Sequence, residues 1–166
     1  MRRLAGLLLT GVLLTAQAED PPTVAPAAPA VTLAVVVAAD DLRAQIDRSV
    51  LSLVYRRKRQ FWPDGRRIHP INLPAAHPLR VQFSQQVLGA NPAALVDYWN
   101  AEYFLGVLPP FVAASPEALA TRVAQTPGAV GYVSACAVDA RLRVLFYLPP
   151  NGAGETGAPD CPDRNL

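Results

Sequence analysis

The sequence predicts an α/β domain in which a small mixed sheet is flanked by helices. Three observations lead to this prediction. Residues 31–39 form a continuous apolar run rich in β-branched side chains, and three later segments place apolar residues at helical spacing behind an X-Pro start. Two strand-like runs then follow at residues 129–134 and 142–148. This order is typical of a sheet of about four strands with helices packed against it.

The first half of the domain contains the expected order strand, helix, strand. The run at residues 31–39 has the length of a strand buried on both faces, as in a parallel sheet covered by helices. Between residues 47 and 57 apolar side chains recur at helical spacing. Trp62-Pro63-Asp64-Gly65 is typical of a turn, because proline presets φ and glycine accepts a positive φ. Residues 68–73 are then expected to form a short strand.

Three helices are expected next, each with proline at its first position, where the missing N–H costs nothing. They begin at His77-Pro78, Asn91-Pro92 and Ser115-Pro116, and Asn91 and Ser115 are good N-cap residues. They are expected to end at Gly89, near Gly106 and before Thr126. Four aromatic residues of the second helix are expected in the core and rim of its packing, with a stacking platform for a sugar or peptide as the alternative: Tyr98, Trp99, Tyr103 and Phe104.

The N-terminal residues have the pattern of a cleavable signal peptide covering residues 1–18. Met1-Arg2-Arg3 precedes an apolar run that ends in the small-x-small triplet Ala16-Gln17-Ala18. Residues 19–30 are predicted to be a Pro/Ala-rich disordered leader and residues 149–166 a flexible tail, which leaves residues 31–148 as the folded domain. We therefore expect an exported protein, periplasmic or secreted, with no membrane span once the signal is cleaved.

The charge balance argues against a polyelectrolyte binder. The chain has 15 basic and 13 acidic residues, and loss of Arg2 and Arg3 with the signal brings its net charge of +2 to zero. We therefore expect no nucleic-acid partner. The sparse histidines and cysteines also predict neither an enzyme, a cofactor nor a metal site. A Cys136–His77 pair is the nucleophilic combination that stays open.

Short motifs follow one another along the domain in a specific order. They are Phe61-Trp62-Pro63-Asp64-Gly65, Pro70-Ile71-Asn72-Leu73-Pro74, His77-Pro78-Leu79-Arg80, Val87-Leu88-Gly89 and Thr126-Pro127-Gly128-Ala129-Val130-Gly131-Tyr132-Val133. This series resembles the phosphate-binding-protein-like domains of bacterial ABC importers, which have the type II periplasmic binding-protein fold. The resemblance covers about residues 33–147 and corresponds to one lobe of that two-lobed fold.

The resemblance implies phosphate or another small oxyanion as ligand and an ABC permease as partner. In the family the anion is held by hydroxyls, backbone N–H groups, an arginine and an aspartate, and one loop reads arginine followed by a D-G-S-G-T-like turn. The stretch from Asn72 to Leu79 takes the place of that loop and lacks its arginine, glycines and hydroxyls. Asn72, His77 and Arg80 are the candidate ligand-binding residues here. Alternatively, Asn72 closes a turn, His77 caps the helix and Arg80 is solvated.

Two further features are candidates for contacts or cross-links. Six basic residues surround Phe61 and Trp62, and they are interpreted either as a contact surface for an anionic envelope partner or as a solvated helix end. They are Arg56, Arg57, Lys58, Arg59, Arg66 and Arg67. Export predicts a disulfide between Cys136 and Cys161, with two free or intermolecular thiols as the alternative.

The leading hypothesis is therefore an exported solute-binding-like module that takes phosphate or another small oxyanion for an ABC importer. The alternative is an envelope interaction or accessory protein that keeps the fold without a ligand site. In that case the basic cluster would be its contact surface.

Overall fold

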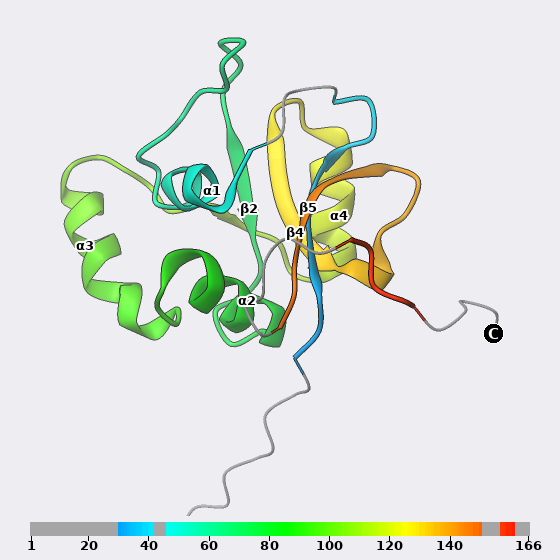
Figure 1. Ribbon diagram of the computed structural model, residues 1–166. Coiled ribbons are helices and arrows are strands. Elements are labelled where there is room, and N and C mark those ends of the chain that lie inside the picture. Colours follow the sequence, from blue (N-terminus) through cyan, green and yellow to red (C-terminus); the bar gives the residue numbers. More distant parts are fainter. Residues whose placement is uncertain (1–29, 42–45, 151–156, 162–166) are drawn as a thin grey trace, which may run out of the picture.

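The computed structural model describes residues 30–41, 46–150 and 157–161, which form one α/β unit around a five-stranded mixed sheet (Figure 1). The strand order is β3-β2-β4-β1-β5. The expected signal peptide and nearly all of the leader lie outside the described residues, as does most of the expected tail. Within the described ranges, no helix is long and apolar enough to cross a membrane.

The strand β1 (Leu33–Ala38) lies between β4 (Ala129–Ser134) and β5 (Leu142–Leu148). All six of its residues are buried, as the apolar run predicts for a strand covered on both faces. The expectation of parallel pairing for this run was wrong, because β1 is antiparallel to both of its neighbours. Burial on two faces depends on the helices that cover the sheet and does not determine the direction of the neighbouring strands.

The strand β2 (His69–Asn72) supplies the parallel part of the sheet, since it pairs in parallel with β4 and with β3 (Phe111–Val112). The sequence predicted about four strands, and β3 is the strand that it did not predict. This strand has two residues, both exposed, and it follows Pro109-Pro110 directly. A segment that is so short, and preceded by residues without N–H groups, carries no strand pattern in the sequence.

The helices begin and end close to where the capping residues predict. They are α1 (Arg48–Tyr55), α2 (Pro78–Phe83), α3 (Val96–Phe104) and α4 (Pro116–Gln125). A π-helical turn at Ser84–Leu88 extends α2 to Gly89, and a 3₁₀ turn at Ala93–Leu95 leads into α3. The predicted caps form as expected, because Asn91 Oδ1 accepts from the Ala94 N–H at 2.8 Å and Ser115 Oγ from the Ala118 N–H at 3.1 Å.

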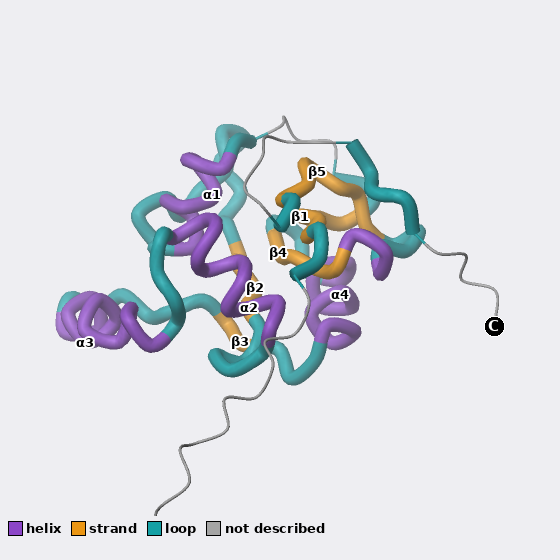
Figure 2. Tube along the Cα trace, turned by 60° about the horizontal axis from the view of Figure 1, so that its bottom comes forward, coloured by secondary structure: helices purple, strands orange, loops and turns teal. Residues whose placement is uncertain are grey.

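Neighbouring residues of β4 show how the two faces of the sheet are covered. A Cβ on Gly131 would lie 2.7 Å from side-chain atoms of Leu119 and Val123, so α4 packs directly against this glycine. The next side chain, Tyr132, points to the opposite face, where its ring stacks on Phe83 of α2 with centroids 3.9 Å apart. Figures 1 and 2 show the same arrangement, with α1 and α2 on one side of the sheet and α4 on the other.

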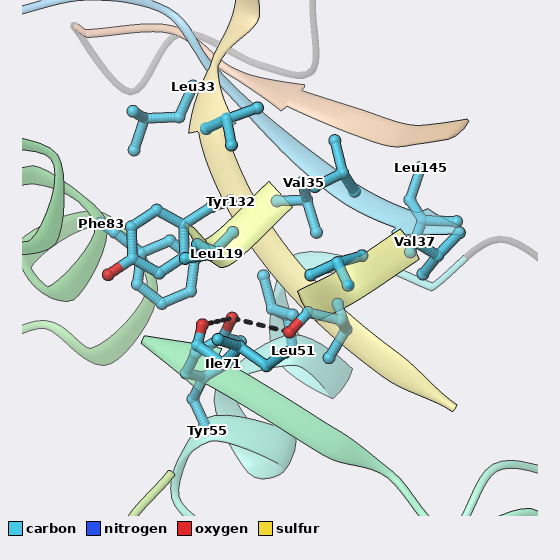
Figure 3. Close-up of a cluster of buried hydrophobic side chains, with 14 of the residues drawn as sticks. Leu33, Val35, Val37, Leu51, Tyr55, Ile71, Phe83, Leu119, Tyr132 and Leu145 are labelled. Atoms are coloured by element: carbon cyan, nitrogen blue, oxygen red, sulfur yellow. Dashed lines mark hydrogen bonds between the residues drawn. The ribbon is translucent and has the colours of Figure 1, made fainter. Parts of the chain in front are cut away.

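Aromatic residues join these helices to the parallel strands (Figure 3). The buried Tyr55 hydroxyl of α1 donates to the Ile71 carbonyl at 2.9 Å and lies 3.3 Å from the Val130 carbonyl. One side chain thus contacts the backbones of β2 and β4. Its ring also packs on Phe83 with centroids 4.6 Å apart. Burial raises the pKa of Tyr55 well above its ordinary value, so the hydroxyl keeps its proton and remains a donor.

Helix α3 lies at the outside of the molecule, beyond α1 and α2 (Figures 1 and 2). The expectation that its aromatic residues form core and rim holds for Tyr98 and Trp99, which are half-buried. It was wrong for Tyr103 and Phe104, which are 63% and 87% exposed. The apolar residues of α3 are distributed around the helix, and only one side of it faces the rest of the domain.

The turn before β2 and the turn before β4 meet at Gly128. Its carbonyl oxygen accepts the Trp62 indole N–H at 3.0 Å and the His69 backbone N–H at 3.1 Å. Gly128 has φ of +85°, and a Cβ on it would lie 2.2 Å from the Arg67 carbonyl oxygen. Glycine is therefore required here by the conformation and by the close approach of a second backbone.

We predict that Gly128→Ala destabilises the domain by about 3 kcal/mol, because the new methyl group meets a backbone that cannot rotate away. Gly65→Ala is the matched control, since Gly65 also has a positive φ, of +83°, but has open space around the missing Cβ. The control is expected to lose about 1 kcal/mol, the cost of the backbone conformation alone. Urea unfolding followed by circular dichroism measures both values. Equal losses in the two variants would contradict the proposed close approach.

Candidate functional site

The junction between β2 and α2 contains the three candidate ligand-binding residues, and each has a different environment. His77 is the N-cap of α2, where its Nδ1 accepts the Leu79 N–H at 3.2 Å. The other ring nitrogen is not used by this cap. His77 also lines an open pocket of about 840 Å³ together with Val31, Leu79 and Gln82. It is therefore the member of the three that borders an open space.

Asn72 lies inside the domain at the end of β2. Its side chain is buried, and its Oδ1 accepts the Tyr132 hydroxyl proton at 3.0 Å. The same hydroxyl accepts the Leu73 N–H at 3.3 Å. Burial raises the pKa of Tyr132 above its ordinary value, so it stays protonated and able to donate. Asn72 thus holds the tyrosine in place rather than presenting its amide oxygen at the surface.

Arg80 is the most unusual residue of the junction, because its positive charge lies in the interior. The residue is 7% exposed, and its Nε and Nη1 atoms are buried without a hydrogen-bond partner. Among the described residues no carboxylate forms an ion pair with it, and burial lowers its pKa. The expected solvated or surface-presented Arg80 was therefore wrong. An unpaired charge in the interior costs free energy, so an anion bound to this guanidinium would stabilise the domain.

A second unpaired group lies four residues along the chain from Arg80. The Ser84 hydroxyl is fully buried and has no hydrogen-bond partner. Sequence reasoning missed this residue, although a hydroxyl four positions after an arginine on a helix lies on the same face. The junction thus links Asn72 and Arg80 through their shared neighbour Tyr132 and adds Ser84. His77 stands apart at the pocket.

The six basic residues do not act as one surface. Arg56 donates to the Leu88 carbonyl at 2.7 Å and lies over the Tyr98 ring, while Lys58 pairs with the carboxylate of Glu102 in α3. Arg66 forms ion pairs with Asp64 and, at 3.6 Å, with Asp41. Arg59 and the exposed Arg67 complete the cluster, and Arg57 turns toward His69. Four of the six side chains are therefore engaged within the domain, because Arg57 also donates to the Ile68 carbonyl at 3.4 Å.

The two cysteines are joined in a disulfide, with Cα atoms 5.4 Å apart. Cys136 lies in a short turn after β4, and Cys161 lies in the described segment 157–161. A disulfide-bonded sulfur is not a nucleophile, so a Cys136–His77 catalytic pair is not formed in this structure. Among the described residues, no group of three or more histidine, cysteine or acidic side chains could hold a metal ion.

We predict that reduction of the disulfide lowers the free energy of unfolding by about 3 kcal/mol, because it releases a loop that constrains the unfolded chain. The cysteines are 25 residues apart. Urea unfolding with and without a reductant measures the change. A Cys136→Ser, Cys161→Ser double variant is the control and should not respond to the reductant. Unchanged stability of the wild type after complete reduction would contradict the prediction.

The fold resembles those of solved phosphate-binding proteins. An ABC-type phosphate transport receptor from Vibrio cholerae superposes with a TM-score of 0.55 at 20% identity over 69% of this chain and 46% of that chain. A phosphate ABC transporter substrate-binding protein with bound phosphate from Clostridium perfringens gives 0.56 at 15%, over 69% and 44%. PstS from Borrelia burgdorferi gives 0.53 at 13%, over 69% and 47%.

These likenesses confirm the predicted fold class. The described residues form a single-lobe domain of the phosphate-binding-protein-like fold, and the chain spans less than half the length of the structures it matches. No family model matches the chain, and no curated protein sequence matches it either.

Proposed function

We propose that the chain is an exported solute-binding-like protein that holds phosphate or another small oxyanion at the junction between β2 and α2. The observation that carries this proposal is the buried Arg80 guanidinium with two nitrogens that have no partner. An arginine fork matches the oxygens of a phosphate in two parallel hydrogen bonds, and a bound anion would neutralise the buried charge.

The surrounding residues have complementary roles in this proposal. Ser84 would donate its unpaired hydroxyl to the anion. Asn72 would hold the Tyr132 ring beside Arg80, and His77 would border the entrance from the open pocket. A buried site strengthens each of these interactions, because water does not compete for the donors.

The neighbours in structure support the same class of function. They are described as a phosphate transport receptor, as a phosphate ABC transporter substrate-binding protein and as PstS, and none is described as an enzyme. An ABC permease would then be the partner and the periplasm the location. The signal pattern of residues 1–18, which lie outside the described residues, supports export, and residues 31–148 would be the binding domain.

A second candidate function is an envelope interaction protein that keeps the fold without a ligand. Six large apolar side chains between the end of α3 and β3 are exposed, and they favour this function because exposed apolar surface often marks a contact site. They are Tyr103, Phe104, Leu105, Leu108, Phe111 and Val112.

Calorimetry with phosphate tests the proposed binding function. We predict saturable heat for the wild type below about 1 mM phosphate, a binding free energy of roughly 4 kcal/mol or more. Arg80→Met should remove the part of this heat that comes from binding at the junction. It should also unfold at the same urea concentration as the wild type or at a higher one, because a buried unpaired charge is replaced by an apolar chain of similar length.

Arg48→Met is the matched control, since it removes one positive charge at the start of α1 and leaves the junction intact. It should bind phosphate as the wild type does. If a folded wild-type sample gives no heat at about 10 mM phosphate, the solute-binding function is wrong and the interaction function is favoured.

A further inference from the structure

A pocket of about 140 Å³ lies at the start of β2, at the end of the strand opposite to the junction with α2. Figure 1 shows the turn that precedes β2 and the helix that follows it at opposite ends of the strand. The pocket is bordered by the end of α1, by the first residues of β2, by the segment leading into β3 and by α4. Its lining includes Arg57, His69, Phe111, Arg122 and Thr126.

Positive charge gathers around this pocket from three parts of the chain. Arg57 and Arg122 line it together with His69. Burial lowers the pKa of His69, and the charges of Arg67, Arg57 and Arg122 lower it further. Burial and the charge of Arg67 also lower the pKa of Arg57. None of the described residues that line the pocket is acidic.

Arg57 occupies a backbone position that favours glycine. Its φ is +60°, and among the described residues it is the non-glycine residue with a positive φ. The Arg57 N–H donates to the Val54 carbonyl at 3.0 Å and the Lys58 N–H to the Leu53 carbonyl at 2.9 Å, the hydrogen bonds of a helix end that normally carries glycine. A strained residue at such a position points to a role for its side chain.

That side chain has unused hydrogen-bonding capacity. Arg57 Nη1 donates to the Ile68 carbonyl over 3.4 Å, and Nε is buried without a partner. Arg122 is oriented differently, since its guanidinium carbon lies 3.9 Å from the centre of the Phe111 ring. Stacking on the ring fixes the plane of the guanidinium and leaves its N–H groups free to point around the ring edge.

We infer that this pocket is a binding site for a small doubly charged oxyanion of the phosphate or sulfate class. Arg57 and Arg122 would both donate to the anion, with the Thr126 hydroxyl and His69 as further donors. The bound charge would offset the positive charges of Arg57, Arg67 and Arg122 that act on His69. This site shares no residue with the junction of Asn72, His77, Arg80 and Ser84, so it stands or falls independently of the proposed function.

The two histidines of the chain allow both sites to be observed in one sample of the full chain. His69 lines the proposed pocket and His77 borders the junction. In an NMR titration with sodium sulfate at constant ionic strength, the His69 ring signal should shift and saturate. Its pKa should rise by about one unit, because a nearby anion favours the protonated ring over the repulsion of Arg57, Arg67 and Arg122. Phosphate should shift His69 in the same way.

Variants separate this site from a general effect of charge. Arg57→Gly should weaken sulfate binding at least about tenfold while its midpoint of urea unfolding is equal to or higher than that of the wild type. Arg122→Gln should weaken binding without the gain in stability. Arg59→Gln, which removes a charge two residues away from Arg57, is the matched control and should bind as the wild type does. Arg80→Met should leave the His69 response unchanged.

Three outcomes would overturn the inference. They are a His69 shift that does not saturate, a shift of the same size with chloride at equal ionic strength, and unchanged sulfate affinity in Arg57→Gly. A phosphate response of His77 that is lost in Arg80→Met, together with no response of His69, would support the proposed function and reject this second site. The reverse pattern would support the second site and reject the proposed function.

Discussion

The carbonyl oxygen of Gly128 accepts hydrogen bonds from the Trp62 indole and from the His69 backbone, and the first of these spans 66 residues of sequence. These bonds join the turn before β2 to the turn before β4, and the two strands then run in parallel from this point. Both candidate sites depend on this register. His69 lies at the start of β2 beside the arginine pocket, and Asn72 lies at its end beside Tyr132. The glycine is needed because a Cβ would collide with the Arg67 carbonyl.

Two arginines occupy positions where packing and backbone conformation favour other residues. Arg80 is a buried cation without a carboxylate partner among the described residues, and Arg57 has a left-handed backbone that glycine adopts without strain. Neither choice improves the stability of the domain. Residues that lower stability are typical of sites with a function, because binding of a ligand compensates their cost. Both arginines have unpaired N–H groups, so the compensating ligand in each case would be an acceptor with negative charge.

Local patterns in the sequence predict the helices well, but they do not predict which distant segments pair with each other. Ser115-Pro116 and Asn91-Pro92 mark helix starts because a cap and a proline act within one turn. The antiparallel direction of β1 and the existence of β3 depend on partners far along the chain. The same holds for the site. The alternative interpretation of His77 as a helix cap is borne out by its hydrogen bond with the Leu79 N–H. The burial of Arg80 beside Tyr55 and Tyr132 was not expected, because both tyrosines lie far from it in the sequence. The sequence also showed the basic cluster only as a local excess of positive charge. The ion pairs of Lys58 with Glu102 and of Arg66 with Asp41 could not be expected, because these acidic residues lie outside the cluster in the sequence.

The exported chain is expected to have zero net charge, but its positive charges are not evenly paired with acidic groups. Lys58 and Arg66 form ion pairs with Glu102 and Asp64. The charges of Arg57, Arg122 and Arg80 are placed at the two ends of one short strand. From His69 to Asn72 the strand rises by roughly 10 Å, which exceeds the screening length of about 8 Å at physiological ionic strength. At this separation an anion at one end would change the affinity at the other end little, so phosphate can occupy both ends of the strand independently.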